Sequence, residues 1–200
     1  MSLIIKENIM TIHKDLDCVL ADEREIDQIV SELADEFNRK YSYVDGVNNK
    51  LLVICILKGA FVFMTDLVRK LTAPLQIEFM QVSSYGASSV SSGALVIKLD
   101  LPDSYDLSEY DILIVEDIVD SGHTLKNLTE NLASRNAKSV ATCVMLDKPS
   151  RRVNNYIPNY IGKKIPDVFV VGYGLDFDEK YRHLPYIGVL KPSVYENYEK

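Results

Sequence analysis

Short apolar runs separated by helical segments are the feature of this sequence that most restricts its fold. Leu51–Leu57, Asp111–Val115 and Ser139–Leu146 are runs of strand length with few polar residues. Helical patterns follow the first two, over Phe61–Leu71 and Leu125–Arg135, and shorter strands are expected at Leu75–Val82 and Leu95–Leu99. Apolar strands that alternate with helices are typical of a parallel sheet covered on both faces. The pattern predicts an α/β core over residues 45 to 148.

The two ends of the chain show different patterns. Asp22 can cap a helix whose apolar positions run from Ile26 to Tyr41, and Asp45-Gly46 predicts a turn after it. The last fifty residues carry short strand patterns broken by prolines, at Tyr160–Lys163, Val168–Val171 and Ile187–Leu190. No linker divides the chain. We therefore expect one domain, 1–200, with a small irregular lobe packed on its core.

Composition excludes several classes of protein. The 200 residues carry a formal charge of −7, which argues against the field of Lys and Arg that broad nucleic-acid binding requires. The longest apolar run has seven residues (Leu51–Leu57), whereas a membrane helix needs about 20. The three cysteines form no CxxC pair, and the chain starts with no secretory signal pattern. We expect reduced thiols in a cytoplasmic protein that is not in a membrane and does not bind nucleic acid.

The segment from Ile112 to Leu128 carries the strongest chemical signal. A strand leads into Glu116 and Asp117, Asp120 follows, and residues 121–124 (Ser-Gly-His-Thr) open a helix. In a parallel sheet, ligands bind at the carboxyl ends of the strands. Free amides at a helix N-terminus favour a phosphate, and clustered carboxylates need a cation or hydroxyl groups beside them. The pattern predicts a sugar phosphate site.

Two other interpretations of this segment compete with a phosphate site. Glu116 and Asp117 could simply cap a solvated loop, although the order strand, acids, small-residue turn and helix favours a phosphate site. The letters ILIVED also resemble the acidic start of a response-regulator receiver domain. That motif lies near the amino terminus of a receiver, whereas here it follows 111 residues and precedes a phosphate-binding turn.

VEDIVDSGHTL, from Val115 to Leu125, resembles the phosphoribosyl-pyrophosphate (PRPP) signature of type I phosphoribosyltransferases. Similar features from LKGAFVF at Leu57 to DEKYRHLPYIGVL at Leu190 narrow the resemblance to the hypoxanthine-guanine phosphoribosyltransferases. The resemblance implies the type I fold, a twisted and mostly parallel sheet with helices on both faces. It also implies a small hood lobe that binds the purine, formed by residues 149–200 with the N-terminal segment.

The resemblance implies a role for each residue of the signature. Glu116 and Asp117 would hold the ribose hydroxyls, directly or through Mg²⁺, and Asp120 would handle the ring proton of the purine. The 5′-phosphate would lie on the turn formed by Ser121, Gly122, His123 and Thr124. His123 departs from the Lys or Arg of some relatives, which matters little where backbone amides bind the phosphate.

Further motifs imply the rest of the site. Lys58 and Gly59 match the pyrophosphate loop, which often holds a non-proline cis peptide, and Arg182 matches the pyrophosphate-binding arginine. Ser84 and Tyr85 begin a stretch that resembles a flexible loop closing over the reacting centre. The purine would be met by Lys148 at its 6-oxo group, by Phe169 stacked on the ring and by the Val170 backbone, with Asp176 as a further acid on the magnesium side. Taken singly, each could be an ordinary loop, core or surface residue.

The implied reaction transfers the phosphoribosyl group of PRPP to hypoxanthine or guanine, which gives IMP or GMP and pyrophosphate. The implied cofactor is Mg²⁺, on Glu116, Asp117 and Asp176, in a homo-oligomer (dimer or tetramer). A PRPP-binding regulator remains an alternative, but it would carry a DNA-binding segment or a basic face. An adenine- or orotate-specific relative is the nearer alternative, and Lys148 favours a 6-oxo base. The sequence leaves the preference among hypoxanthine, guanine and xanthine open.

Overall fold

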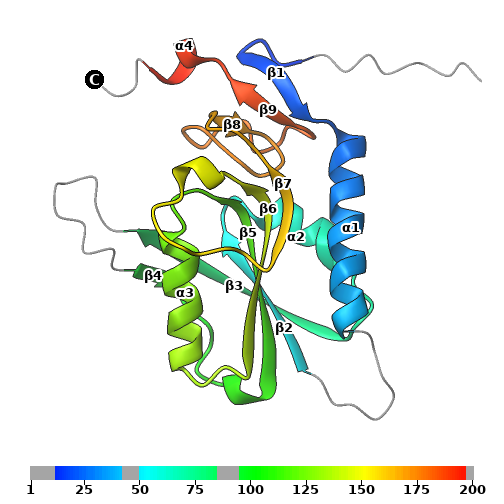
Figure 1. The fold of residues 1–200 in the computed structure, drawn as a ribbon, viewed down its shortest axis with the longest axis vertical. Helices are drawn as coiled ribbons and strands as arrows, with labels where there is room; N and C mark the ends of the chain where they lie inside the picture. Colours follow the sequence, from blue (N-terminus) through cyan, green and yellow to red (C-terminus); the bar gives the residue numbers. More distant parts are fainter. Residues whose placement is uncertain (1–11, 42–49, 85–94, 197–200) are drawn as a thin grey trace, which may run out of the picture.

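A computed structural model describes residues 12–41, 50–84 and 95–196. The turn predicted at Asp45-Gly46 and the loop from Tyr85 onward lie outside these residues. Six strands form the main sheet in the order β4-β3-β2-β5-β6-β7 (Figure 1). Their bounds are β2 Lys50–Leu57, β3 Leu75–Ser84, β4 Leu95–Leu99, β5 Tyr110–Val119, β6 Ser139–Asp147 and β7 Tyr160–Lys164. Only β4 is antiparallel among these six strands, so the mostly parallel sheet predicted from the sequence is confirmed.

The order of the strands reverses between β2 and β5, and we call the region at the carboxyl ends of these two strands the crevice. From β2 the chain passes to β3 on one side and returns to β5 on the other side, with Cys55 opposite Val115 in parallel register. Such a reversal opens a ligand-binding crevice at the carboxyl ends of the two strands. β5 extends to Val119, past the predicted end at Val115. The acids at 116 and 117 therefore lie within a strand.

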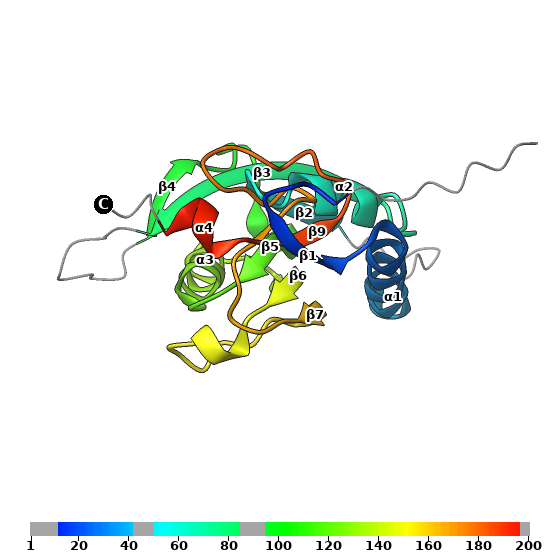
Figure 2. The same cartoon turned by 90° about the horizontal axis from the view of Figure 1, so that it is seen from above.

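Helices cover both faces of this sheet, and each face has its own core. α1 (Glu23–Tyr41) and α2 (Phe61–Val68) pack on one face, and α3 (His123–Ser134) packs on the other, as Figure 2 shows from above. Asp22 caps α1 as predicted, because its Oδ1 accepts from the amides of Arg24 and Glu25 at 3.0 and 2.9 Å. Fully buried side chains such as Phe63 and Leu128 anchor the two cores.

α2 is shorter than predicted, because it ends at Val68 and not at Leu71. The amide of Lys70 bonds to the Leu67 carbonyl at 2.9 Å, which tightens the last turn. The Asn38 side chain on α1 then donates to the Lys70 carbonyl at 3.0 Å. The end of α2 is therefore fixed by a contact from a distant part of the chain.

A second, three-stranded antiparallel sheet stacks above the main sheet in Figure 1. It has the order β1-β9-β8, with β1 at Leu16–Ala21, β8 at Val170–Val171 and β9 at Ile187–Leu190, and α4 (Pro192–Tyr195) follows it. β8 begins two residues later than predicted. β7 belongs to the main sheet, so that sheet continues beyond residue 148. We call this second sheet with α4 the hood.

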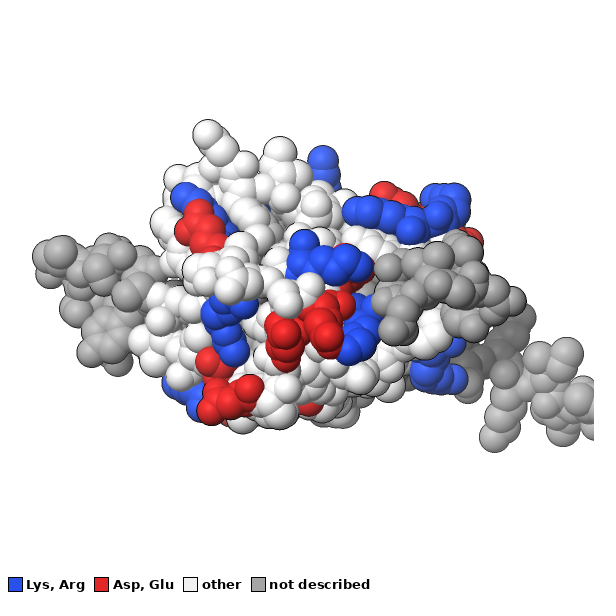
Figure 3. Space-filling view, turned by 90° about the horizontal axis from the view of Figure 1, so that it is seen from below, with Lys and Arg blue, Asp and Glu red and all other residues white. Residues whose placement is uncertain are grey.

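The surface and the thiols agree with an ordinary globular domain. Seen from below, acidic and basic side chains are interspersed, and neither kind covers the face in a continuous field (Figure 3). The three cysteines form no disulfide; Cys55 and Cys143 are buried, and Cys18 is exposed. None of the helices in the described segments is both long and apolar enough to cross a lipid bilayer.

Candidate active site

The pyrophosphate loop and the acidic end of β5 meet in the crevice. Lys58 and Gly59 follow β2, and the Leu57-Lys58 peptide bond is cis. A Cβ atom placed on Gly59 would lie 1.5 Å from Asp117 Oδ2, so only glycine leaves room for this carboxylate. Gly59 is also close to Gly174, where an added Cβ would lie 2.1 Å from the Gly59 carbonyl oxygen. These close approaches bring the end of β2, the end of β5 and the segment after β8 together.

Glu116 and Asp117 are half-buried, and the pKa values of both carboxyl groups are raised. Burial, followed by the neighbouring Asp117 carboxylate, raises the pKa of Glu116 well above its usual value, and burial also raises the pKa of Asp117. Glu116 Oε2 is buried and has no hydrogen-bond partner among the described residues. An unsatisfied buried oxygen next to a second carboxylate suits a cation or a ribose hydroxyl. No three His, Cys, Asp or Glu side chains of the described residues form a cluster that could hold a metal ion by themselves.

The turn after β5 opens α3. Gly122 has a φ of 85°, a conformation that side chains disfavour, and α3 begins at His123. The first helical hydrogen bond runs from the Lys126 amide to the Gly122 carbonyl, at 3.1 Å. The amides of the first turn have no intrahelical acceptors, so this end of the helix can bind an anion. The side chain of His123 is exposed, and the amide of His123 lies 3.4 Å from Ser121 Oγ.

A chain of ion pairs connects the predicted acid–base residue to the predicted purine-binding lysine. Asp120 Oδ1 accepts from Arg151 Nε at 2.9 Å, and Arg151 Nη1 lies 3.4 Å from Asp167 Oδ2. Asp167 Oδ1 in turn lies 3.9 Å from Lys148 Nζ. The Lys148 side chain is only 12% exposed, so this lysine is not a solvated surface charge. The structure therefore brings Asp120 and Lys148 to one end of the crevice.

An aromatic pair stands at the edge of the hood. Phe169 is 36% exposed and stacks on Tyr195 of α4, with ring centroids 5.1 Å apart and an interplanar angle of 25°. Phe177 packs edge-on against Phe169 at 5.5 Å. Val170 begins β8 and is buried. An exposed, supported ring of this kind can stack on a flat heterocycle.

The two basic residues predicted to bind pyrophosphate form ion pairs with carboxylates. Lys58 Nζ lies 3.0 Å from Glu179 Oε2, and Arg182 Nη2 lies 3.3 Å from the same oxygen. Arg182 Nη1 also lies 3.0 Å from Asp176 Oδ1 and donates to the Gly174 carbonyl at 2.9 Å. Asp176, which was predicted on the magnesium side, is thus the partner of Arg182.

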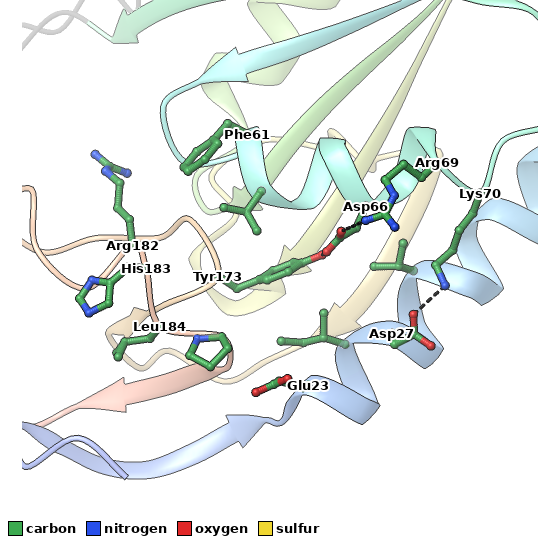
Figure 4. A pocket seen from close by; sticks show the side chains of 14 residues that line it. Glu23, Asp27, Phe61, Asp66, Arg69, Lys70, Tyr173, Arg182, His183 and Leu184 are labelled. Carbon is green, nitrogen blue, oxygen red and sulfur yellow. Dashed lines mark hydrogen bonds and ion pairs between the residues drawn. The ribbon is translucent and has the colours of Figure 1, made fainter. Parts of the chain in front are cut away.

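A cavity of about 520 Å³ adjoins this region between α1, α2 and the segment 182–185. Figure 4 shows Tyr173 crossing it toward Asp66, with which it forms a 2.8 Å hydrogen bond. Burial, together with this bond, raises the pKa of Tyr173. Lys70 in the wall is paired with Asp27 at 2.6 Å. The cavity shares Arg182 with the crevice but contains none of the acids of β5, so we assign the chemistry to the crevice.

The sequence analysis missed several charged residues of the crevice: Arg151, Arg152, Asp167 and Glu179. Arg151 and Arg152 follow Lys148 closely at the end of a predicted strand. This cluster of three cations was an available signal. Glu179 gave no comparable signal, because its partners Lys58 and Arg182 come from other segments of the chain.

Comparisons with known proteins agree with this geometry. The sequence model of the phosphoribosyl transferase domain family matches residues 20–178. The chain is 48% identical over 183 residues to the hypoxanthine-guanine phosphoribosyltransferase of Bacillus subtilis, covering 92% of this chain and 98% of that protein. It is similar to the crystal structure of a Staphylococcus aureus hypoxanthine phosphoribosyltransferase, with a TM-score of 0.84, 45% identity, and 92% and 96% of the two chains covered. For a Trypanosoma cruzi hypoxanthine phosphoribosyltransferase the TM-score is 0.86 at 37% identity, with 94% and 98% covered.

Proposed function

Because this chain belongs to the phosphoribosyl transferase domain family, we propose that the crevice between β2 and β5 performs the reaction for which its relatives are named. The protein is a transferase of the hypoxanthine-guanine phosphoribosyltransferase type, and its function is purine salvage. The phosphoribosyl group of PRPP passes to hypoxanthine or guanine, which gives IMP or GMP and releases pyrophosphate. One observation carries the assignment to this crevice: the acids of β5, the turn at Gly122 and the Gly59 loop meet at the sheet's switch point.

The turn at residues 121–124 binds the 5′-phosphate of PRPP in this proposal. Its support is the open N-terminus of α3, where free amides and the helix dipole attract an anion. Ser121 and Thr124 add hydroxyl groups. Glu116 and Asp117, on the preceding strand, then reach the ribose hydroxyls of the same substrate.

The purine lies at the other end of the crevice, below the hood. Lys148 donates to the 6-oxo group, Phe169 stacks on the ring, and the backbone of Val170 meets the base edge. Asp120 accepts or shares the ring proton, which makes the ring nitrogen a better nucleophile. The ion pair between Asp120 and Arg151 supports this role, because it holds the carboxylate in the chain of ion pairs that leads to Lys148.

The departing pyrophosphate is stabilised by Lys58, the Gly59 loop and Arg182. Negative charge grows on this group as the bond to the anomeric carbon breaks, so fixed cations lower the barrier. Mg²⁺ would be held by Glu116 and Asp117 together with substrate oxygens, as is usual for Mg²⁺ with phosphate substrates. Bound there, it would neutralise charge on the substrate. The unpartnered Glu116 Oε2 supports this assignment.

The proposed enzyme is a cytoplasmic homo-oligomer, a dimer or a tetramer. The free cysteines are consistent with a reducing compartment. Light scattering on the purified protein measures the oligomeric state directly. A monomer at working concentration would contradict this part of the proposal.

A base-exchange assay tests the function. The protein is incubated with PRPP, Mg²⁺ and hypoxanthine, guanine, xanthine, adenine or orotate in turn, and nucleotide formation is followed. We expect turnover with hypoxanthine and guanine. Turnover with only adenine or orotate would contradict the assignment of the base pocket. PRPP binding without turnover on any base would favour a regulator, and phosphorylation by a small phosphodonor would favour a receiver module.

A further inference from the structure

The segment that follows β6 wraps around the end of β5 and the phosphate-binding turn. We call residues 148–154 the brace. The Lys148 amide donates to the Val119 carbonyl at 3.0 Å, and the Val153 amide donates to the Ser121 carbonyl at 3.2 Å. Between these two bonds, Arg151 holds the carboxylate of Asp120. The brace thus bonds to three of the four residues from 119 to 122.

That fourth residue is Gly122, and two side chains of the brace lie against it. A Cβ atom placed on Gly122 would lie 2.7 Å from Arg152 Cδ and 2.7 Å from Asn154 Oδ1. Arg152 and Asn154 therefore fill the space that a side chain at position 122 would need. Because Gly122 precedes the first residue of α3, these contacts fix the backbone that presents the amides of the turn.

Arg152 is held firmly in this position. Its guanidinium Nη2 pairs with Asp147, the last residue of β6, and the two side chains are only 11% and 6% exposed. A buried pair of this kind depends on both members, because loss of one leaves the other charged and unpaired. The pair therefore fixes the guanidinium between the main sheet and the turn.

One nitrogen of the Arg152 guanidinium has no hydrogen-bond acceptor within the part of the chain that the structure describes. Arg152 Nη1 and Asn154 Nδ2 are both buried, and neither has a hydrogen-bond partner among the described residues. Buried donors are normally satisfied, so unsatisfied ones call for an explanation. Arg152 Nη1 would lie 3.1 Å from a Cβ on Gly122, directly beside the turn. A guanidinium N–H without an acceptor in the described segments thus lies beside the anion site.

We propose that Arg152 is a positioning residue for the 5′-phosphate of PRPP: anchored by Asp147, it fixes the turn at Gly122 and keeps a guanidinium N–H beside it. This inference rests on the proposed function, because it presumes that the turn binds the 5′-phosphate. It concerns only one end of the substrate. The pyrophosphate end is served by Lys58 and Arg182, and the purine by Lys148, so loss of Arg152 affects one binding constant selectively.

The test uses a double substitution, because Arg152→Met alone leaves Asp147 buried without a partner. The double variant Asp147→Leu with Arg152→Met removes both charges at similar volume, and buried pairs replaced in this way often keep the fold. Arg152→Lys keeps the charge. Arg135→Met is the matched control, because Arg135 forms a 2.8 Å ion pair with Asp100, outside the crevice. Thermal unfolding identifies the variants that are folded.

Michaelis constants are then measured for PRPP and for hypoxanthine, together with the inhibition constant of pyrophosphate. We expect the double variant to raise the constant for PRPP at least about tenfold. The constants for hypoxanthine and pyrophosphate, and all constants of the Arg135→Met control, stay near those of the wild type. Arg152→Lys recovers most of the PRPP affinity.

An unchanged PRPP constant in a folded double variant would overturn the inference, and so would equal losses for PRPP, hypoxanthine and pyrophosphate. Failure of the proposed function gives a different result, since the wild-type protein itself would then form no nucleotide from PRPP.

Discussion

Lys58 and Glu179 are 121 residues apart in the chain, yet Lys58 Nζ lies 3.0 Å from Glu179 Oε2. The same carboxylate lies 3.3 Å from Arg182 Nη2. Lys58 first and Arg182 second hold the pKa of Glu179 below its usual value, so this carboxylate is a stable anion at neutral pH. One carboxylate therefore occupies both cations that we assign to pyrophosphate. We expect a bound pyrophosphate to compete with Glu179 for these two side chains.

Glu179→Gln removes this competition. We expect pyrophosphate to inhibit nucleotide formation more tightly in the variant, by only about two- to fivefold, because an exposed ion pair is a weak competitor. The inhibition constant of pyrophosphate against PRPP gives the measurement. Asp178→Asn is the matched control, since Asp178 pairs with Lys180 at 2.9 Å. Weaker inhibition in Glu179→Gln, or the same change in both variants, would contradict this account.

Asp120→Asn tests the acid–base assignment. The side chains have nearly the same shape, so we expect the fold and PRPP binding to survive while turnover falls about 10²- to 10⁴-fold, the usual contribution of a positioned acid or base. Single-turnover kinetics measure the chemical step, and calorimetric titration with PRPP measures binding. Unchanged turnover would assign Asp120 to ribose binding or to structure.

Lys148→Met tests whether this lysine selects the base. The 6-oxo group of the purine accepts a hydrogen bond from the Lys148 ammonium. Without the lysine, this buried oxygen is left unpaired, at a cost of about 1–3 kcal/mol. We therefore expect the Michaelis constants for hypoxanthine and guanine to rise about ten- to a hundredfold or more, with that for PRPP nearly unchanged. Lys164→Met, at the exposed end of neighbouring β7, is the control. If PRPP binding collapsed while purine binding held, Lys148 would belong to the phosphate site.

Local sequence order was enough to predict the layout of the crevice. In a parallel sheet the carboxyl ends of the strands share one edge, so the motifs after Leu57 and Val115 had to meet there. The two glycines of these motifs also indicated close packing. In the structure, a side chain at Gly59 would meet Asp117, and one at Gly122 would meet Arg152 and Asn154. The buried strands were evident for the same reason, because a strand covered on both faces must be apolar throughout.

Contacts between distant segments were beyond prediction from the sequence. The polar pair Glu116-Asp117 suggested that β5 stops at Val115, yet hydrogen bonding to β6 carries the strand through these acids. Pairing of Arg151 with Asp120 and of Lys58 with Glu179 depends on how loops are placed in space. No local periodicity encodes such pairs.

The raised pKa of Glu116 predicts that the stability of the metal-free protein depends on pH. Burial, and then the nearby Asp117, raises the folded-state pKa of Glu116 well above its ordinary value of 4.5. A raised pKa in a carboxylic acid means that the folded state favours the protonated form. The contribution of Glu116 to the free energy of unfolding is therefore fully present below pH 4.5, and it is lost as the pH rises through the folded-state pKa.

Glu116→Gln mimics the protonated form at every pH. In excess chelator we expect the variant to unfold at the same temperature as the wild type near pH 4 and at a higher temperature near pH 8. Near pH 8 the unfolding temperature of the variant should exceed that of the wild type by about 3–5 °C for each unit by which the pKa of Glu116 is higher in the folded state than in the unfolded state. Thermal unfolding scans from pH 4 to pH 8 measure it, with the exposed Glu130→Gln on α3 as the control.

We expect magnesium to reduce the difference between the two proteins near pH 8. A cation held by Glu116 and Asp117 compensates the buried negative charge and binds only the folded state, so Mg²⁺ raises the unfolding temperature of the wild type near pH 8. The Gln variant lacks one of the two carboxylates and gains less.

In the enzyme assay, excess chelator abolishes turnover and Mg²⁺ restores it. A variant less stable than the wild type at pH 8 in chelator would mean that Glu116 is ionised against a stabilising partner, and full turnover in chelator would exclude the magnesium role.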